Sequence, residues 1–332
     1  MYRFFLVIST LLLALGSTAV HGQPGAKKLF ISLTDEGNLG VIDPASGRIV
    51  RRIQVGRKPV ALQLNADRSR LYVSNTASNN ISVVDPATDA VITTVGIPIT
   101  RRDVFIGPIV YSAATNTLYV AEASHEPLSL NIYVLDCKLN AVTDVFDAGP
   151  GIVDIAVSRD GSRLYVVGES TITVYSLPGF AVLHSISPPP GHRPTGVAVH
   201  PSEPLLAATY GTLNKVLLTN TENWETEAEI EIPKRFQGRQ DAVIFSPDGS
   251  RIFVATHKTS ARGLSGVIIM NAELLEMKKY VPIGEVKRGM AVSPDGLRGY
   301  FASDRLTELN LLTYAEIKRL DFRRAIGCIV AM

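Results

Sequence analysis

A short β-rich tetrad recurs seven times along this chain of 332 residues, and this repetition restricts the folds that the chain can adopt. Successive tetrads start 42, 47, 46, 41, 47 and 47 residues apart. The seven tetrads are Leu29–Ser32, Leu71–Ser74, Leu118–Ala121, Leu164–Val167, Leu205–Ala208, Ile252–Ala255 and Gly299–Ala302. A period of about 40 to 50 residues is typical of the blades of a β-propeller, whereas solenoid repeats of that length are helical.

Each repeat holds four short apolar runs separated by turn residues. In the second repeat these runs are 71–74, 81–85, 91–95 and a segment around 109–111, all rich in Val, Ile and Tyr. Runs of this length and composition indicate β-strands. Four strands per repeat and seven repeats predict an all-β fold, a seven-bladed β-propeller with four antiparallel strands per blade.

Two kinds of turn agree with this interpretation. Asp-Gly pairs precede three of the tetrads, at Asp160, Asp248 and Asp295, where a tight hairpin needs a residue that tolerates positive φ. Aspartates also end the strands 41–43, 83–85 and 134–136, and we interpret their side chains as initiators of the following turn.

The two ends of the chain predict how the ring closes. The first repeat lacks the strand that precedes the tetrad in the other repeats, and the terminal segment 325–332 matches that strand. A 3+1 closure by the C-terminal strand would join the ends in one blade and leave no open sheet edge at the seam. We therefore expect residues 23–332 to form a single seven-bladed β-propeller domain.

The N-terminus has the pattern of a secretory signal peptide. Arg3 precedes an apolar run from Phe4 to Leu15, and small or compact residues lead to Gly22. The run is shorter than the roughly 20 residues that a membrane span needs. We expect cleavage after about Gly22, a periplasmic or secreted protein, and no membrane span after cleavage. Removal of residues 1–22 takes away one of 33 basic residues and none of the 31 acidic ones, so the net charge is near zero.

The repeats resemble the YVTN-type propeller repeat of secreted and surface proteins. The likeness rests on Leu71-Tyr72-Val73-Ser74-Asn75, on Ile81-Ser82-Val83-Val84-Asp85, and on the Ser-Pro-Asp-Gly turns at 246–249 and 293–296, and it extends over nearly all of residues 23–332. It implies the propeller fold. It does not imply one function, because such propellers bind and scaffold as well as carry lactonase, lyase or redox chemistry.

Binding residues are expected on one face. Four long segments, 97–107, 122–131, 233–240 and 257–265, follow a tetrad or connect two blades, and both kinds of connection open on the same face. Basic residues recur before the innermost strands and predict an anion site at the channel mouth, unless nearby acids neutralise them. These residues are Arg57, Lys58, Arg101, Arg102, Arg193, Arg239, Arg288 and Arg324.

Three residues are candidates for catalysis. Asp154 occupies an inner-strand slot that is small in other repeats, so it could face the channel or cap a backbone N–H group. His192 and His257 map to the long-loop face, where either could act with Asp154 as acid, base or metal ligand of an enzyme.

Other site chemistry lacks support in the sequence. No histidine pair has metal-ligand spacing, so we predict no metal site, and no cofactor motif is identifiable. Cys137 and Cys328 fall in different blades and strand layers, so we expect two free thiols. Trp224 lies in a hairpin of the opposite face and is interpreted as a packing residue.

The leading hypothesis is a monomeric binding or scaffolding propeller. Its partner would be an anionic small molecule, a polysaccharide, a nucleic acid strand or a protein. An enzyme of the lactonase-like hydrolase or lyase type, with its site at the same channel mouth, is the alternative. An accessory protein of a periplasmic redox system is a third possibility.

Overall fold

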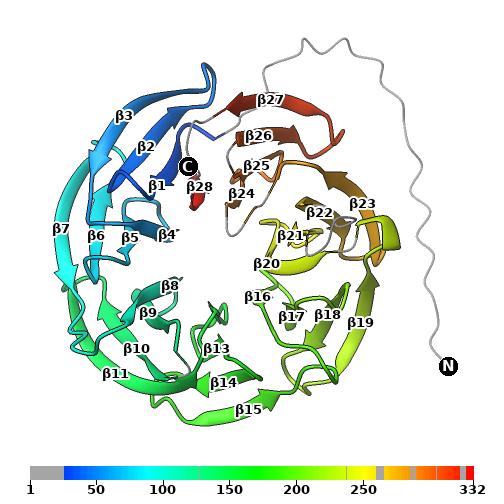
Figure 1. Cartoon of the computed structure of the whole chain (residues 1–332), viewed down its shortest axis with the longest axis horizontal. Helices are drawn as coiled ribbons and strands as arrows, with labels where there is room; N and C mark the ends of the chain where they lie inside the picture. The colour runs from blue at the N-terminus through cyan, green and yellow to red at the C-terminus, as the bar shows by residue number, and fades with distance from the viewer. Residues whose placement is uncertain are drawn as a thin grey trace, which may run out of the picture.

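Seven four-stranded antiparallel sheets are arranged around a central axis in the computed structural model, and they form a seven-bladed β-propeller (Figure 1). The structure describes residues 26–126, 128–236, 238–258, 265–284, 286, 289–303, 305–321 and 327–332. The predicted fold is confirmed. The predicted signal peptide lies outside the described residues, and none of the described helices is long and apolar enough to cross a membrane.

The blades are numbered in chain order, and their strands run from the channel outwards. Blade 1 contains β28 (Ile329–Ala331), β1 (Leu29–Leu33), β2 (Asn38–Asp43) and β3 (Arg48–Gln54). Blade 2 contains β4 (Pro59–Leu64), β5 (Leu71–Asn75), β6 (Asn80–Asp85) and β7 (Ala90–Gly96). Blade 3 contains β8 (Val104–Ser112), β9 (Thr117–Ser124), β10 (Ser129–Asp136) and β11 (Ala141–Pro150).

The other four blades follow the same order. Blade 4 contains β12 (Asp154–Val157), β13 (Arg163–Val167), β14 (Ile172–Ser176) and β15 (Val182–Ile186). Blade 5 contains β16 (Gly196–Val199), β17 (Leu205–Thr209), β18 (Lys215–Asn220) and β19 (Thr226–Glu231). Blade 6 contains β20 (Arg239–Phe245), β21 (Arg251–His257), β22 (Gly266–Asn271) and β23 (Glu276–Val281), and the 3-10 helix η1 (Lys234–Phe236) precedes it. Blade 7 contains β24 (Met290–Val292), β25 (Arg298–Ala302), β26 (Arg305–Asn310) and β27 (Glu316–Asp321).

The ring closes as the sequence predicts. β28 pairs with β1 in antiparallel register, with Ile329 opposite Ile31 and Ala331 opposite Leu29. The N–H group of Ser32 also donates to the carbonyl of Cys328 at 3.0 Å. The C-terminal strand therefore completes the blade that the N-terminal strands begin, and the backbone edge of β1 is paired.

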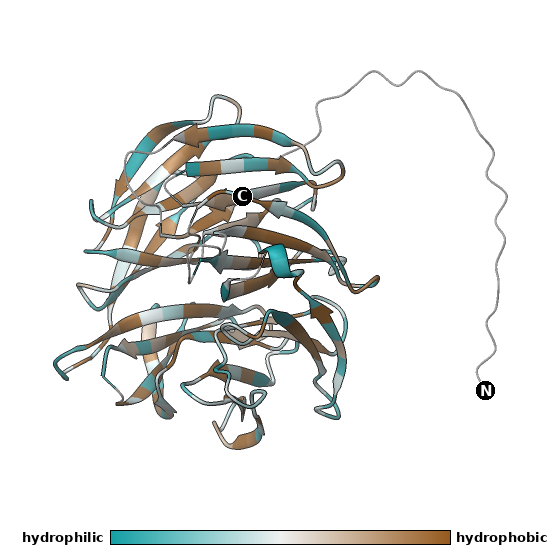
Figure 2. Ribbon diagram, turned by 45° about the vertical axis from the view of Figure 1, so that its right-hand side comes forward, coloured by the Kyte–Doolittle hydropathy of each residue, from teal (hydrophilic) through white to brown (hydrophobic). Residues whose placement is uncertain are grey.

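The core lies between neighbouring blades and is built from the tetrad strands. Every residue of β1 and β5 is buried, whereas most of the outermost strand β3 is exposed. Each blade buries both faces of its second strand against its neighbours, so these strands read as continuous apolar runs without alternation. Figure 2 shows the hydrophobic residues along the strands, and the hydrophilic ones in many connecting loops and in η1.

Both predicted turn types are present. Gly161, Gly249 and Gly296 have φ between 70° and 76°, so the Asp-Gly pairs do supply left-handed residues. Asp43 accepts hydrogen bonds from the N–H groups of Ala45 and Ser46 at 3.1 Å, and the Ser46 side chain together with these N–H groups lowers its pKa. The side chains that end these strands initiate the turns, as interpreted from the sequence.

The cysteines and Trp224 also follow the predictions. Cys137 and Cys328 are free thiols, and burial raises the pKa of Cys137 to about 11. Trp224 stacks on His184 at a centroid distance of 4.7 Å, and the guanidinium of Arg163 lies 5.3 Å from the Trp224 ring centroid. Trp224 therefore packs on the outer part of blades 4 and 5.

Candidate functional site

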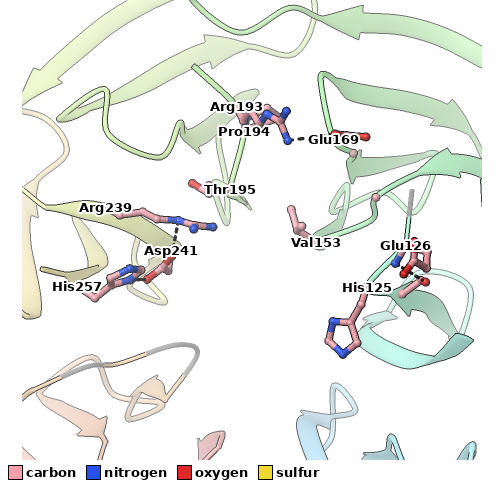
Figure 3. A pocket seen from close by; sticks show the side chains of 13 residues that line it. His125, Glu126, Val153, Glu169, Arg193, Pro194, Thr195, Arg239, Asp241 and His257 are labelled. Carbon is pink, nitrogen blue, oxygen red and sulfur yellow. Dashed lines mark hydrogen bonds and ion pairs between the residues drawn. The ribbon is translucent and has the colours of Figure 1, made fainter. Parts of the chain in front are cut away.

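A cavity of about 770 Å³ opens where blades 3, 4, 5 and 6 meet at the channel mouth. It is built from the loops that follow β9 and β13, the ends of β20 and β21, and the connections that precede β12 and β16. These connections all belong to the face that the sequence assigned to binding. The lining residues include His125, Glu126, Val153, Glu169, Arg193, Pro194, Thr195, Arg239, Asp241 and His257 (Figure 3).

On the blade 6 side of the cavity, Asp241 bridges the side chains of Arg239 and His257. Asp241 of β20 contacts the Nε atom of Arg239 through Oδ1 at 3.2 Å, and it contacts Nδ1 of His257 through Oδ2. Arg239 and His257 occupy directly opposed positions of the β20–β21 pair. The carboxylate therefore holds two side chains of adjacent strands in fixed positions at the edge of the cavity.

On the side of the cavity formed by blades 4 and 5, Arg193 and Glu169 form an ion pair that is exposed to solvent. The guanidinium of Arg193 lies 3.1 Å from Oε1 of Glu169, and their side chains are 75% and 41% exposed. Exposed pairs of this kind are worth about 0 to 1 kcal/mol. A ligand that offers a better partner can therefore displace Glu169 from Arg193 at little cost.

The blade 3 wall contributes His125 and Glu126, from the loop after β9. His125 packs on Phe105 at a centroid distance of 5.3 Å. Ser124 accepts a hydrogen bond from the N–H group of Glu126 at 3.0 Å. Figure 3 shows His125 and Glu126 across the open cavity from Arg239 and His257.

The lining carries no excess of positive charge. Its guanidinium groups are Arg193 and Arg239, and its carboxylates are Glu126, Glu169 and Asp241. With both imidazoles neutral, the described lining has one more carboxylate than guanidinium group. Among the described residues, the cavity therefore has acidic and basic side chains in similar numbers, and it lacks the positive potential that a ring of basic residues would produce.

The structure brings only some of the sequence-predicted basic residues together. Arg193 and Arg239 share the cavity, but Arg57, Lys58, Arg101 and Arg102 do not line it. Arg57 donates to the carbonyl of Ala77 at 2.9 Å. Arg288 and Arg324 lie outside the described residues.

Arg101 does not line the cavity and instead pairs with the buried carboxylate of Glu122. Glu122 is 1% exposed and receives an ion pair from Arg101, a hydrogen bond from the Tyr133 hydroxyl at 3.0 Å and one from the Asn131 N–H group at 2.7 Å. Burial and the Glu122 carboxylate raise the pKa of Tyr133 to about 12. A buried carboxylate needs such compensation, so the role of Arg101 is structural. Glu122 also continues β9, which makes the segment 122–131 partly strand.

Asp154 and His192 do not line the cavity that His257 lines. The Asp154 carboxylate accepts a hydrogen bond from the N–H group of Val197 in the next blade at 3.2 Å, which matches the capping alternative of the sequence analysis. His192 has a buried Nδ1 atom with no hydrogen-bond partner among the described residues. Neither residue lines the cavity, so only His257 of the three catalytic candidates does.

The sequence missed the acidic half of the site. The sequence pattern treats acids only as neutralisers of nearby arginines, and it singles out none of Glu126, Glu169 and Asp241 as a site residue. A signal existed, because His125, Glu169 and His257 all follow a tetrad by two to four residues, where the chain opens on the cavity. No group of three or more His, Cys, Asp or Glu side chains that could hold a metal ion occurs among the described residues.

Comparisons of sequence identify no relative. No protein-family model matches the chain, and no curated protein matches it.

Solved structures match the fold over most of the chain. A structure described as Kuenenia stuttgartiensis hydrazine synthase has a TM-score of 0.69 and 16% identity, covering 94% of this chain and 99% of the other. A functionally unknown protein from Desulfotomaculum acetoxidans has a TM-score of 0.73 and 13% identity, covering 92% and 99%. The β-propeller domain of Myceliophteria thermophila Cps50 (Swd1) has a TM-score of 0.67 and 11% identity, covering 82% and 90%. At these identities the likeness shows the propeller fold alone, shared by proteins of varied function.

Proposed function

We propose that this chain is an exported binding propeller of the YVTN type that holds a small anionic ligand in the cavity between blades 3 and 6. The recurrent tetrads and the Ser-Pro-Asp-Gly turns support the repeat type, and the N-terminal pattern supports export to the periplasm or the extracellular space. The observation that carries the binding proposal is that Arg193 and Arg239 line one cavity, at a face rich in long loops.

The size and charge of the cavity favour a small ligand over a polyanion. A nucleic acid strand is held mainly by many phosphate contacts with basic side chains. The described lining offers two guanidinium groups among three carboxylates, which suits one anionic group surrounded by hydrogen-bonding groups. A volume of about 770 Å³ is within the range of small-molecule sites.

A screen followed by matched variants tests this function. Small carboxylates, phosphates and sulfates are screened by thermal shift, and binding of the best anion is measured by calorimetry at low and high salt. Arg193→Gln and Arg239→Gln should each weaken binding about 10-fold or more, because a charge-assisted hydrogen bond is worth about 1.5 to 3 kcal/mol. Arg57→Gln and Arg102→Gln, outside the cavity, should leave it unchanged. Equal effects of all four variants, or no anion binding in the screen, would remove the proposal.

The contact between His257 and Asp241 favours a second candidate function, hydrolase or lyase chemistry. An imidazole whose Nδ1 atom is held by a carboxylate can act as a general base through Nε2. A panel of lactones, esters and uronides tests this candidate, and turnover should be lost in His257→Gln. Elemental analysis of the purified protein would reveal a bound divalent ion.

A further inference from the structure

Asp241 determines which nitrogen of His257 carries the hydrogen. Both carboxylate oxygens are engaged, Oδ1 by Arg239 and Oδ2 by Nδ1 of His257. A carboxylate only accepts hydrogen bonds, so Nδ1 must be the donor. In the neutral imidazole, Nε2 then presents a lone pair.

The Nε2 atom of His257 is available to a ligand. It makes no hydrogen bond with the described residues, and it is not among the buried atoms that lack a partner. His257 lines the cavity and its side chain is 24% exposed. This atom is therefore an acceptor that a hydroxyl group of a ligand can satisfy.

Asp241 does not contact the two terminal nitrogens of the Arg239 guanidinium group. Asp241 uses Nε, so the two terminal nitrogens retain N–H groups that have no partner among the described residues. Figure 3 shows them reaching further into the cavity than Asp241. The terminal edge of a guanidinium is a fork that binds a carboxylate through two parallel hydrogen bonds.

From this arrangement we propose that the cavity recognises a hydroxycarboxylic acid, with the carboxylate on the terminal nitrogens of Arg239 and the hydroxyl of the adjacent carbon donating to Nε2 of His257. Opposed residues of an antiparallel pair have their Cβ atoms about 4.5 to 5.5 Å apart. Asp241 contacts both side chains, Nε of Arg239 through Oδ1 and Nδ1 of His257 through Oδ2, so one carboxylate lies between the two groups and limits their separation. A ligand that uses both residues must carry its hydroxyl on the carbon next to its carboxylate, or close to it.

The rest of the cavity extends this preference to a polyhydroxylated acid. The carboxylates of Glu126 and Glu169 accept hydrogen bonds, and the Ser124 hydroxyl, which accepts from the N–H group of Glu126, can still donate to a ligand. The cavity is larger than the smallest hydroxy acids require. A sugar acid of the aldonate class supplies a carboxylate, an adjacent hydroxyl and further hydroxyls along one chain. This inference rests on the proposed function, since it names the ligand class of the same site.

Three matched compounds test the inference on the unmodified protein. Calorimetry at pH 7.5 compares D-gluconate with 2-deoxy-D-gluconate, which lacks only the adjacent hydroxyl, and with D-glucitol, which lacks the carboxylate. D-gluconate should bind about 5-fold more tightly than its 2-deoxy analogue, in line with one net hydrogen bond. D-glucitol should show no measurable binding.

Variants assign the two halves of the recognition. His257→Phe should reduce the ratio between the two acids to near 1, while Arg239→Met should weaken both acids about 10-fold or more. His184→Phe, on the outer strand β15 beside Trp224, is the control and should change neither. Circular dichroism checks that each variant is folded.

The outcomes separate this inference from the proposed function. Equal affinities for the two acids, a ratio that survives His257→Phe, or no binding of D-gluconate would each overturn the hydroxycarboxylate class. The proposed function would still stand if another anion bound and depended on Arg193 and Arg239. It would fall separately if no anion from the screen did so.

Discussion

His200 of blade 5 fills the space in front of Gly249 in the Asp-Gly turn of blade 6. Its Nδ1 atom accepts hydrogen bonds from the N–H groups of Ser202 and Glu203 at 3.3 and 2.9 Å, so the ring is anchored. A Cβ atom placed on Gly249 would lie 2.1 Å from Nε2 of His200. The turn of one blade and the side chain of its neighbour are thus closely fitted.

Gly249→Ala should lower the free energy of unfolding by about 3 kcal/mol. A φ of 76° costs an L-residue about 1 to 2 kcal/mol, and overpacking against an anchored ring adds about 1 to 3 kcal/mol. Gly296→Ala is the matched control, because its φ is 71° and nothing lies within 4 Å of the added Cβ atom. It should cost only about 1 kcal/mol. Urea denaturation measures both, and similar losses would argue against the contact with His200.

Ile329→Ala should destabilise the closing blade by about 2 to 4 kcal/mol. Ile329 is 2% exposed and packs with the cluster that joins blades 1 and 7, so truncation leaves a cavity at the seam of the ring. Ile317→Ala, on the outermost strand β27 at 43% exposure, should cost less than about 1 kcal/mol. Thermal denaturation of both variants checks this, and an equal loss would mean that the seam contributes little.

Asp154→Ala should affect stability and leave ligand binding unchanged. The carboxylate joins blade 4 to the Val197 N–H group of blade 5, and loss of that hydrogen bond should cost about 1 to 2 kcal/mol. Asp154 does not line the cavity. Urea denaturation and anion calorimetry on the same sample separate the two roles. Binding lost at unchanged stability would restore Asp154 as a functional residue.

The contribution of Asp160 should depend on pH. Hydrogen bonds from Ser158 and Ser162 lower the pKa of Asp160 from 3.8 to about 2. A carboxyl whose pKa is depressed by folding stabilises the folded state above pH 4, and this contribution is lost as the pH falls towards 2. Asp160→Asn should therefore lower the free energy of unfolding at pH 7 by no more than about 1 kcal/mol, since the turn is largely exposed. Urea denaturation at pH 7, 4 and 3 should show the difference shrinking, and a constant difference would contradict this account.

The fold was predictable because its signals are local and repeated. Tetrads such as Leu71–Ser74 are apolar throughout because both faces are buried, and turn residues such as Gly249 and Asp43 mark the hairpins. The closure by Ile329–Ala331 followed from counting, because one strand was missing at the start of the chain and one was surplus at its end. The segment 122–131 was expected to be a loop after the tetrad, but buried Glu122 continues β9 to Ser124 and β10 begins at Ser129.

The candidate site was predictable only as a face and a set of residue types. Arg193, Arg239 and His257 were among the candidates, but so were Arg57 and Arg101, which have the same repeat position and serve the backbone or a buried carboxylate. Side chains at equivalent positions differ in role because each loop has its own length and neighbours. No periodic pattern records those differences.

The sequence by itself determined the number of blades, the strand order and the face on which the long loops open, because backbone hydrogen bonding and alternation of turns depend on residues close together in the chain. Only the tertiary structure decided that Glu169 meets Arg193 and that Asp241 joins Arg239 to His257 at the edge of one cavity. Those contacts join separate strands and neighbouring blades, and they depend on the distance and direction of side chains across a packed ring.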